Sequence, residues 1–253
     1  MSTIQLTIEP KALFLYPSAR DYIAILKTVA ELVDETAIHV DSEGVHIRAL
    51  DPSRIAMLII DLPPETFHEF KVDESISIGL AVSNLAKILK NLKKSDKMIV
   101  AANEEYVEIV IEGINPRRYK FRNITVLAEE VPELKPVYDV EASILTSPLK
   151  TTITELSDIA STIGISSDSE SLTFFDYDTR KSTYRLTTAS GNIVSLTVNK
   201  SVTVPYDSEY IAKVIDILSL GNVVDLKYGS EAPLHLSLEF AGGKIMYYLA
   251  AKA

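Results

Sequence analysis

The sequence predicts an α+β protein built from two similar β-rich units, each with two helices. Short runs such as Gly44–Leu50, Tyr106–Ile111 and Leu234–Phe240 alternate apolar and polar residues, which is the period of half-buried antiparallel strands. Four other segments place apolar residues at spacings of 3 and 4, the period of a helix. The chain has 253 residues, 47% of them hydrophobic, which is enough for two ordinary domains with their own cores.

Each of the four predicted helices begins beside a capping residue. The first follows Ser18, with Asp21 as its capping partner, and the second follows Ser83. The third begins at Ser147-Pro148, where proline suits the first turn, and the fourth follows Asp207-Ser208. We expect one buried stripe per helix: Ile23, Leu26, Ala30 and Val33; Leu85, Ile88, Leu89 and Leu92; Leu149, Ile153, Leu156, Ala160 and Ile163; Ile211, Val214, Ile215 and Leu218.

A short repeat indicates that the chain arose by internal duplication. Residues 85–89 (LAKIL) and 211–215 (IAKVI) are nearly identical and lie about half the chain apart. Between them, residues 123–136 contain prolines and no sustained period, which is typical of an exposed connector. We therefore predict an N-terminal domain over residues 1–122, a connector over 123–136 and a C-terminal domain over 137–253.

The composition excludes several functional classes. The chain has no cysteine, so disulfides, thiolate metal sites and cysteine nucleophiles are excluded. No apolar run approaches the roughly 20 residues of a membrane helix. The first residues lack the basic and apolar regions of a signal peptide, and we expect a cytoplasmic protein that does not bind a membrane.

A search for catalytic motifs gives no candidate active site. The four histidines are scattered, and His39, Asp41 and His46 are joined by no further ligand at a recognised metal-binding spacing. No phosphate-binding, dinucleotide-binding or serine nucleophile motif is present. The carboxylate pairs Glu104-Glu105 and Glu129-Glu130 are interpreted as solvated charge. We expect no catalytic residue, no metal and no cofactor.

Basic residues gather on the predicted helices of an acidic chain. Lys and Arg number 25 against 35 Asp and Glu, so the average surface repels phosphate and any nucleic-acid contact must be local. Lys87, Lys90 and Lys94 are spaced to share one helical face, opposite the buried leucines. Such a face can also serve only for solubility. Because no aromatic residue interleaves with these lysines, we expect a duplex bound through phosphates, without sequence preference.

Four segments resemble one known family, the PCNA-type DNA polymerase sliding clamps, and archaeal members most of all. They are residues 40–47 (VDSEGVHI), 51–57 (DPSRIAM), 87–90 (KILK) and 244–252 (KIMYYLAAK), the last with Ala251 where a proline usually stands. The resemblance implies the DNA clamp fold, with three subunits joined head to tail in a ring whose helices line the hole. It further implies a processivity factor that encircles duplex DNA, associated with the prokaryotic nucleoid, and partners that include DNA polymerase, flap endonuclease, DNA ligase and a clamp loader.

The resemblance also assigns two functional surfaces. The residues implied to face DNA are Arg20, Lys27, Lys87, Lys90, Lys94, Lys150 and Lys213. The residues implied to form a pocket for partner peptides are Val40, Val45, Ile47, Leu127, Val131, Pro132, Pro233, Tyr248, Leu249 and Ala250. For any one pocket residue taken alone, core packing is the alternative interpretation. The third helix offers DNA only Lys150, beside Glu155 and Asp158, so we expect the N-terminal domain to attract phosphate more strongly.

Ring closure in the family pairs two edge strands of neighbouring subunits. The implied interface residues are Arg118, Tyr119, Lys120 and Phe121 on one edge and Lys181, Thr183, Tyr184 and Arg185 on the other. Like charges opposed across a strand pair are unfavourable, which favours a heterotrimer with paralogues, as in some archaeal clamps. Two alternatives stay open: edge cations can simply prevent aggregation, and Asp176 and Asp178 can offset them. A structural β-rich assembly protein that does not bind DNA is the alternative function, and it would not need cations on its helices.

Overall fold

A computed structural model describes residues 5–127, 131–132 and 134–252. The chain divides into two compact units, which are described separately. The N-terminal unit comprises Met1–Pro52, Leu58–Val131 and Ala241–Lys244, and the C-terminal unit comprises Ser53–Met57, Pro132–Phe240 and Ile245–Ala253. Residues 128–130 and 133 of the predicted connector, including Glu129 and Glu130, lie outside the described residues.

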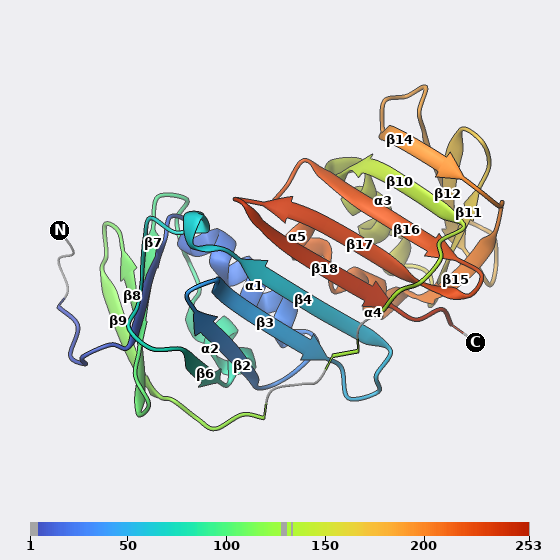
Figure 1. Ribbon diagram of the computed structural model, residues 1–253. Coiled ribbons are helices and arrows are strands. Elements are labelled where there is room, and N and C mark those ends of the chain that lie inside the picture. Colours follow the sequence, from blue (N-terminus) through green and yellow to red (C-terminus); the bar gives the residue numbers. More distant parts are fainter. Residues whose placement is uncertain (1–4, 128–130, 133, 253) are drawn as a thin grey trace. The chain divides into compact units, whose positions relative to one another are not determined.

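The N-terminal unit consists of antiparallel strands and two α-helices (Figure 1). One five-stranded sheet has the order β5-β1-β7-β8-β9, and the remaining strands follow the order β4-β3-β2-β6. The elements are β1 (Ala12–Tyr16), α1 (Ala19–Ala30), β2 (Thr36–Asp41), β3 (Gly44–Leu50), β4 (Ala56–Leu62), a 3-10 turn η1 (Pro64–Thr66), β5 (Glu69–Val72), β6 (Ile76–Leu80), α2 (Val82–Ile88), β7 (Lys97–Ala102), β8 (Tyr106–Glu112) and β9 (Arg117–Arg122).

The C-terminal unit repeats this arrangement. Its strands follow the orders β14-β10-β16-β17-β18 and β13-β12-β11-β15. The elements are β10 (Val140–Leu145), α3 (Thr146–Ser157), β11 (Thr162–Ser167), β12 (Ser171–Asp176), β13 (Thr183–Thr187), β14 (Ile193–Val198), β15 (Thr203–Asp207), α4 (Ser208–Ala212), α5 (Ile215–Leu218), β16 (Val223–Gly229), β17 (Ala232–Phe240) and β18 (Gly243–Leu249).

The two units have the same strand topology. Strands β1 to β9 correspond in order to strands β10 to β18. With this correspondence, the strand orders of the N-terminal unit become those of the C-terminal unit. In each unit the helices pack on one another, α1 on α2 and α3 on both α4 and α5. The predicted pair of similar β-rich units with helices is therefore confirmed, and the short LAKIL/IAKVI repeat belongs to equivalent helices.

Helix α1 forms as its cap and apolar spacing predict. The Ser18 hydroxyl oxygen accepts a hydrogen bond from the Asp21 backbone N–H at 3.3 Å, which satisfies one donor that the first turn leaves free. Ile23, Leu26 and Val29 are buried. The predicted stripe was wrong at Ala30 and Val33, which are half-buried, because the helix ends at Ala30 and the chain then turns towards β2.

Helix α2 differs from its prediction at both ends. It begins at Val82, without a side-chain cap, and ends at Ile88, which is 44% exposed instead of buried. The end follows from backbone geometry, since Leu89 has ψ 68° and Asn91 has φ 57°, values outside the helical region. Buried Asp96 fixes this turn, because its carboxylate accepts the Lys93 N–H at 2.9 Å.

The third and fourth predicted helices also form, with differences at the ends of the third and a break in the fourth. Helix α3 begins at Thr146 and buries Leu149, Ile153 and Leu156, whereas Ile163 already belongs to β11. The predicted fourth helix is two short helices, α4 and α5, with Asp207 as the cap of α4. The Tyr210 carbonyl at the break accepts the Lys213 N–H at 3.2 Å and the Tyr247 hydroxyl at 2.8 Å, so it is not available for a regular helical bond.

No helix within the described residues is both long enough and apolar enough to cross a membrane. The core of the N-terminal unit includes an aromatic cluster in which Phe14 and Tyr16 each pack against both Tyr22 and Phe67, with ring centroids 5.0 to 5.9 Å apart. These rings join β1 and α1 to the chain segment that follows η1. The helix layer of this unit is thereby anchored to its five-stranded sheet.

Candidate nucleic-acid and subunit interfaces

The cations of the N-terminal unit lie on its helix layer. Arg20 and Lys27 are exposed on α1, and Lys87 is exposed in the last turn of α2. Because α1 packs on α2 (Figure 1), these side chains belong to one layer. Within residues 5–127, 131–132 and 134–252, none of the three forms an ion pair. Their charge is therefore available to an anionic ligand.

Lys90 and Lys94 lie beyond the end of α2, so the predicted common helical face of Lys87, Lys90 and Lys94 was wrong. Both are exposed and occupy the turn that leads into β7. The Lys90 carbonyl accepts a hydrogen bond from Arg117 Nη1 at 3.2 Å, which joins this turn to β9. The lysines extend the basic layer through a loop instead of a helix.

The helix cations of the C-terminal unit are less exposed than those of the N-terminal unit, and each has a neighbouring partner. Lys150 on α3 is half-buried and donates a hydrogen bond to the Ser219 hydroxyl. Lys213, at the break between α4 and α5, lies 4.7 Å from the centre of the Tyr210 ring, within cation–π range. This difference in exposure and partners has the direction expected from sequence, and stronger attraction of phosphate by the N-terminal unit stays a prediction.

Four residues of the predicted peptide pocket are core positions. Val40, Val45 and Ile47 have no exposed surface and Leu249 is 1% exposed, so for these the alternative of core packing holds. Leu127, Pro132 and Ala250 are exposed, whereas Val131, Pro233 and Tyr248 are half-buried. The residues are divided between the two units, and a common pocket stays a prediction.

A polar cluster occupies the face of β2 and β3 opposite Val40 and Val45. It joins His39, Asp41 and His46, which the sequence analysis considered only as metal ligands, to Arg48 and Asp61, which were not predicted. His39 Nε2 lies 3.2 Å from Asp41, and His46 Nδ1 lies 2.7 Å from Asp61, which also accepts from Arg48 at 2.6 Å. The alternation of side chains along β2 and β3 could have predicted the cluster, because residues two positions apart lie on the same face of a strand. Among the described residues, no group of three or more such side chains is arranged to hold a metal ion.

A second cluster not predicted from sequence is a stack of rings on the C-terminal unit. His235 of β17 lies parallel to Tyr248 of β18, with ring centroids 4.4 Å apart, and the Tyr138 ring centroid lies 6.0 Å from that of His235. Burial, together with Tyr248 and Glu141, raises the pKa of Tyr138 to about 12. The stack places Tyr248, a predicted pocket residue, against the ring of His235.

Both predicted interface segments are edge strands. Strand β9 is the outermost strand of its five-stranded sheet, and β13 is the outermost strand of its four-stranded sheet. The exposed side chains of β9 are Arg118, Lys120 and Arg122. An edge strand presents free backbone groups to which another chain can pair.

Local acids reduce the like-charge repulsion inferred from sequence. Lys120 Nζ lies 3.9 Å from buried Glu108, and Arg185 Nη2 lies 2.9 Å from Asp168. The backbone N–H of Glu170 and the hydroxyl of Ser171 hold the pKa of Asp168 below its ordinary value, so its charge is retained. Lys181 lies near Asp176, as expected from sequence.

Comparison with known proteins agrees with these features. Residues 21–129 match the family model described as "Proliferating cell nuclear antigen, N-terminal domain". DNA polymerase sliding clamp 1 of Sulfurisphaera tokodaii is 31% identical over 94% of this chain and 98% of its own length. The DNA polymerase sliding clamp of Thermofilum pendens is 27% identical over 94% and 97%.

Solved structures show the same fold. The crystal structure of a PCNA2-PCNA3 complex from Sulfolobus tokodaii superposes with a TM-score of 0.89 at 24% identity, covering 95% of this chain and 99% of that chain. PCNA from Thermococcus kodakaraensis superposes with a TM-score of 0.86 at 22% identity, covering 95% and 100%. Together with the identity to the Sulfurisphaera clamp, these findings establish that the chain belongs to the PCNA family of DNA polymerase sliding clamps.

Proposed function

We propose that this chain is one of three subunits of a ring that encircles duplex DNA and tethers DNA polymerase to it. The observation that carries the proposal is the layer of exposed, unpaired cations Arg20, Lys27 and Lys87 in a chain of net charge −10. Sliding clamps are processivity factors and not enzymes, so the chain acts by keeping the polymerase at the DNA and catalyses no reaction.

Retention on DNA follows from closure of the ring, not from affinity. Contacts between lysine or arginine and phosphate are independent of base sequence and exchange readily. A ring held by its topology can therefore move along the duplex while the cations keep the DNA away from the acidic surface. Strong binding at any one position would hinder this movement.

The proposal is tested by reversing charge at the end of α2. The double substitution Lys87→Glu/Lys90→Glu is expected to abolish stimulation of the partner polymerase on primed circular DNA. The matched control is Lys71→Glu/Lys244→Glu, which reverses two exposed lysines of the same unit that lie on strands. Circular dichroism establishes that both variants are folded. Unchanged stimulation by the α2 variant would remove these lysines from the mechanism.

We also propose that partner enzymes attach to the exposed connector through short peptides with apolar anchors. Leu127 is 88% exposed, so its side chain is accessible to an apolar anchor of a partner. Leu127→Asp is expected to weaken binding of a polymerase-derived peptide, measured by calorimetry. Ile114→Asp, which changes an exposed side chain between β8 and β9, should bind as the wild type does. Equal loss in both variants would contradict a specific site.

A further inference from the structure

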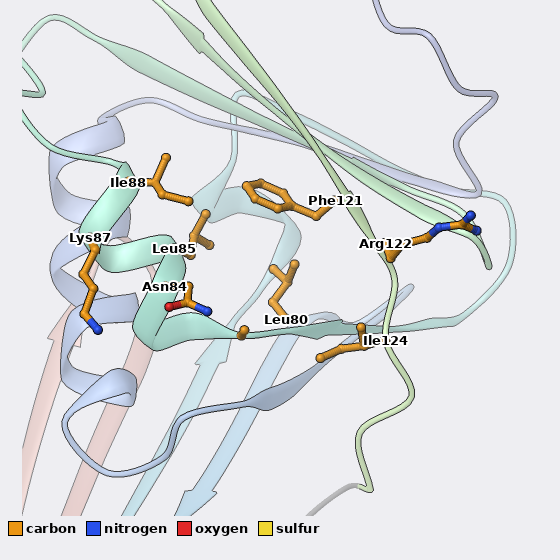
Figure 2. Close-up of a pocket in the computed structure, with 9 residues that line it drawn as sticks. Leu80, Asn84, Leu85, Lys87, Ile88, Phe121, Arg122 and Ile124 are labelled. Atoms are coloured by element: carbon orange, nitrogen blue, oxygen red, sulfur yellow. The ribbon is translucent and has the colours of Figure 1, made fainter.

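The two sides of strand β9 carry different side chains. On the helix side, Phe121 faces Ile88 of α2 across an apolar cavity of about 470 Å³, and Arg122 points to the opposite side (Figure 2). Arg118 and Lys120 share that opposite side with Arg122, because alternate residues of a strand lie on the same face. The five-stranded sheet therefore has a second face, which points away from the helices.

This second face is apolar beneath the cations of β9, and it is buried. Ala101 and Val110 have no exposed surface, and Ile99, which pairs with Val110, is 8% exposed. Leu13 and Leu15 of β1 continue the same rows across the sheet. An antiparallel sheet with one face on the core commonly leaves its other face polar and solvated. A second apolar face therefore needs a cover of its own.

The corresponding face of the C-terminal unit is polar. Strands β10 and β16, which correspond to β1 and β7, carry the cross-strand pairs Glu141–Lys227 and Ser143–Asp225 on this face. Lys227 forms an ion pair with Glu141 at 2.6 Å, and the Ser143 hydroxyl donates to Asp225. Because the two units share the same strand topology, the fold does not require an apolar face here, and it is a special feature of the N-terminal unit.

The cover is the segment before β1, residues 5–9, which we call the strap. It forms neither helix nor strand, and its hydrogen bonds to the sheet involve side chains, such as that from Arg118 to the Gln5 carbonyl at 3.0 Å. Leu6 and Ile8 are half-buried, whereas residues 5, 7 and 9 are exposed. The strap therefore turns its apolar side chains inward.

A buried carboxylate on the apolar face binds the strap. Glu108 pairs with Ala101 on one side and Lys120 on the other, and it has no exposed surface. It accepts hydrogen bonds from the Thr7 backbone N–H, at 2.8 Å, and from the Thr7 hydroxyl. An apolar residue would suit a permanent cover better, since a buried carboxylate is unfavourable unless it is hydrogen-bonded. Glu108 instead makes the face selective for a segment that brings hydrogen-bond donors to one position.

We propose that the strap is displaceable and that the face beneath it is a docking site for an extended segment of a partner protein. The chemistry of the strap defines this segment: an apolar residue stands on each side of a residue whose N–H and hydroxyl donate to Glu108. The strap occupies the site until such a segment replaces it, and it is therefore an autoinhibitory contact. The site is distinct from the connector, so it adds a second class of partner to the proposed function.

The test uses a labelled peptide of residues 2–11 as the probe, with binding measured by fluorescence anisotropy. A shortened chain that lacks residues 2–9 should bind this peptide at least about tenfold more tightly than the full chain, as expected if the strap leaves the site open in about one molecule in ten or fewer. The full-length variant Leu6→Asp/Ile8→Asp, in which the strap is loosened, should behave in the same way. Glu108→Gln in the shortened chain should weaken binding about tenfold, because the amide replaces one acceptor oxygen by a donor.

The matched control is Glu141→Gln in the shortened chain, which changes a partly exposed carboxylate on the corresponding face of the C-terminal unit and should leave binding unchanged. A peptide with Thr7→Pro, which lacks both donors, should not bind. Circular dichroism establishes which variants are folded. Folded variants with an open site that bind the peptide no more tightly than the full chain would overturn the inference. Unfolding of both would also overturn it, because a cover that the chain needs for folding is not displaceable.

Discussion

Lys120 Nζ lies 3.9 Å from Oε1 of Glu108, a fully buried residue on β8 that is paired with Lys120 of the edge strand β9. Thr7 donates to the same carboxylate from its backbone N–H, at 2.8 Å, and from its hydroxyl. The segment before β1 therefore covers the buried charge. It also reaches β9 directly, because the Gln5 carbonyl accepts from Arg118 at 3.0 Å.

Glu108→Ala is expected to lower the free energy of unfolding by about 2 kcal/mol, because the Thr7 donors lose their acceptor in a buried site. The Lys120 charge adds little, since that side chain is partly exposed and solvent screens it. Urea denaturation measures the change. Glu105→Ala, on the exposed turn before β8, is the control and should stay within about 0.5 kcal/mol of the wild type. Equal stability of both variants would contradict a structural role for Glu108.

Ser18→Ala is expected to destabilise the protein by about 1 kcal/mol, because Ser18 caps α1 through the Asp21 N–H. Ser83→Ala is the matched control. Ser83 was predicted to cap α2, but α2 begins at Val82 without a side-chain cap. Thermal unfolding should therefore separate the two variants, and a larger loss from Ser83→Ala would contradict the observed start of α2.

Lys87→Glu is expected to impair clamp function more than Lys150→Glu. Lys87 is exposed and unpaired, whereas Lys150 is half-buried and bonded to Ser219. Primer extension on circular DNA is measured as the salt concentration is raised, because loss of a phosphate contact lowers the salt concentration that the complex tolerates. Equal salt sensitivity of the two variants would indicate that both units contribute alike.

Asp168→Asn is expected to reduce stability at neutral pH but not in strong acid. The folded-state pKa of Asp168 lies below the ordinary value of 3.8, so the carboxylate stabilises the fold above about pH 4 and loses this contribution as pH falls through its folded pKa. Denaturation at pH 7 and at successively lower pH should show the curves of wild type and variant converging. A constant difference at every pH would exclude the charge as the cause.

The sequence by itself determined the class of fold and the family. Alternating strands, the Ser18 and Asp207 caps and the repeat at residues 85–89 and 211–215 are local patterns that backbone geometry and side-chain period impose. They were sufficient to predict two similar β-rich units with helices, and the family resemblance placed both edge strands.

Tertiary contacts alone decided where α2 stops and where the fourth helix breaks. Asp96 closes the turn after α2, and α1 holds it in place because the Ala19 N–H donates to the Asp96 carbonyl at 2.7 Å. At the break in the fourth helix, the Tyr247 hydroxyl donates to the Tyr210 carbonyl, 37 residues away in sequence. The same holds for Glu108 and Asp168, which neutralise edge cations. These partners belong to other helices, strands or turns than the residues that they bind, so no local period can reveal them. The cavity between α2 and β9 likewise exists only once Ile88 and Phe121 are brought together.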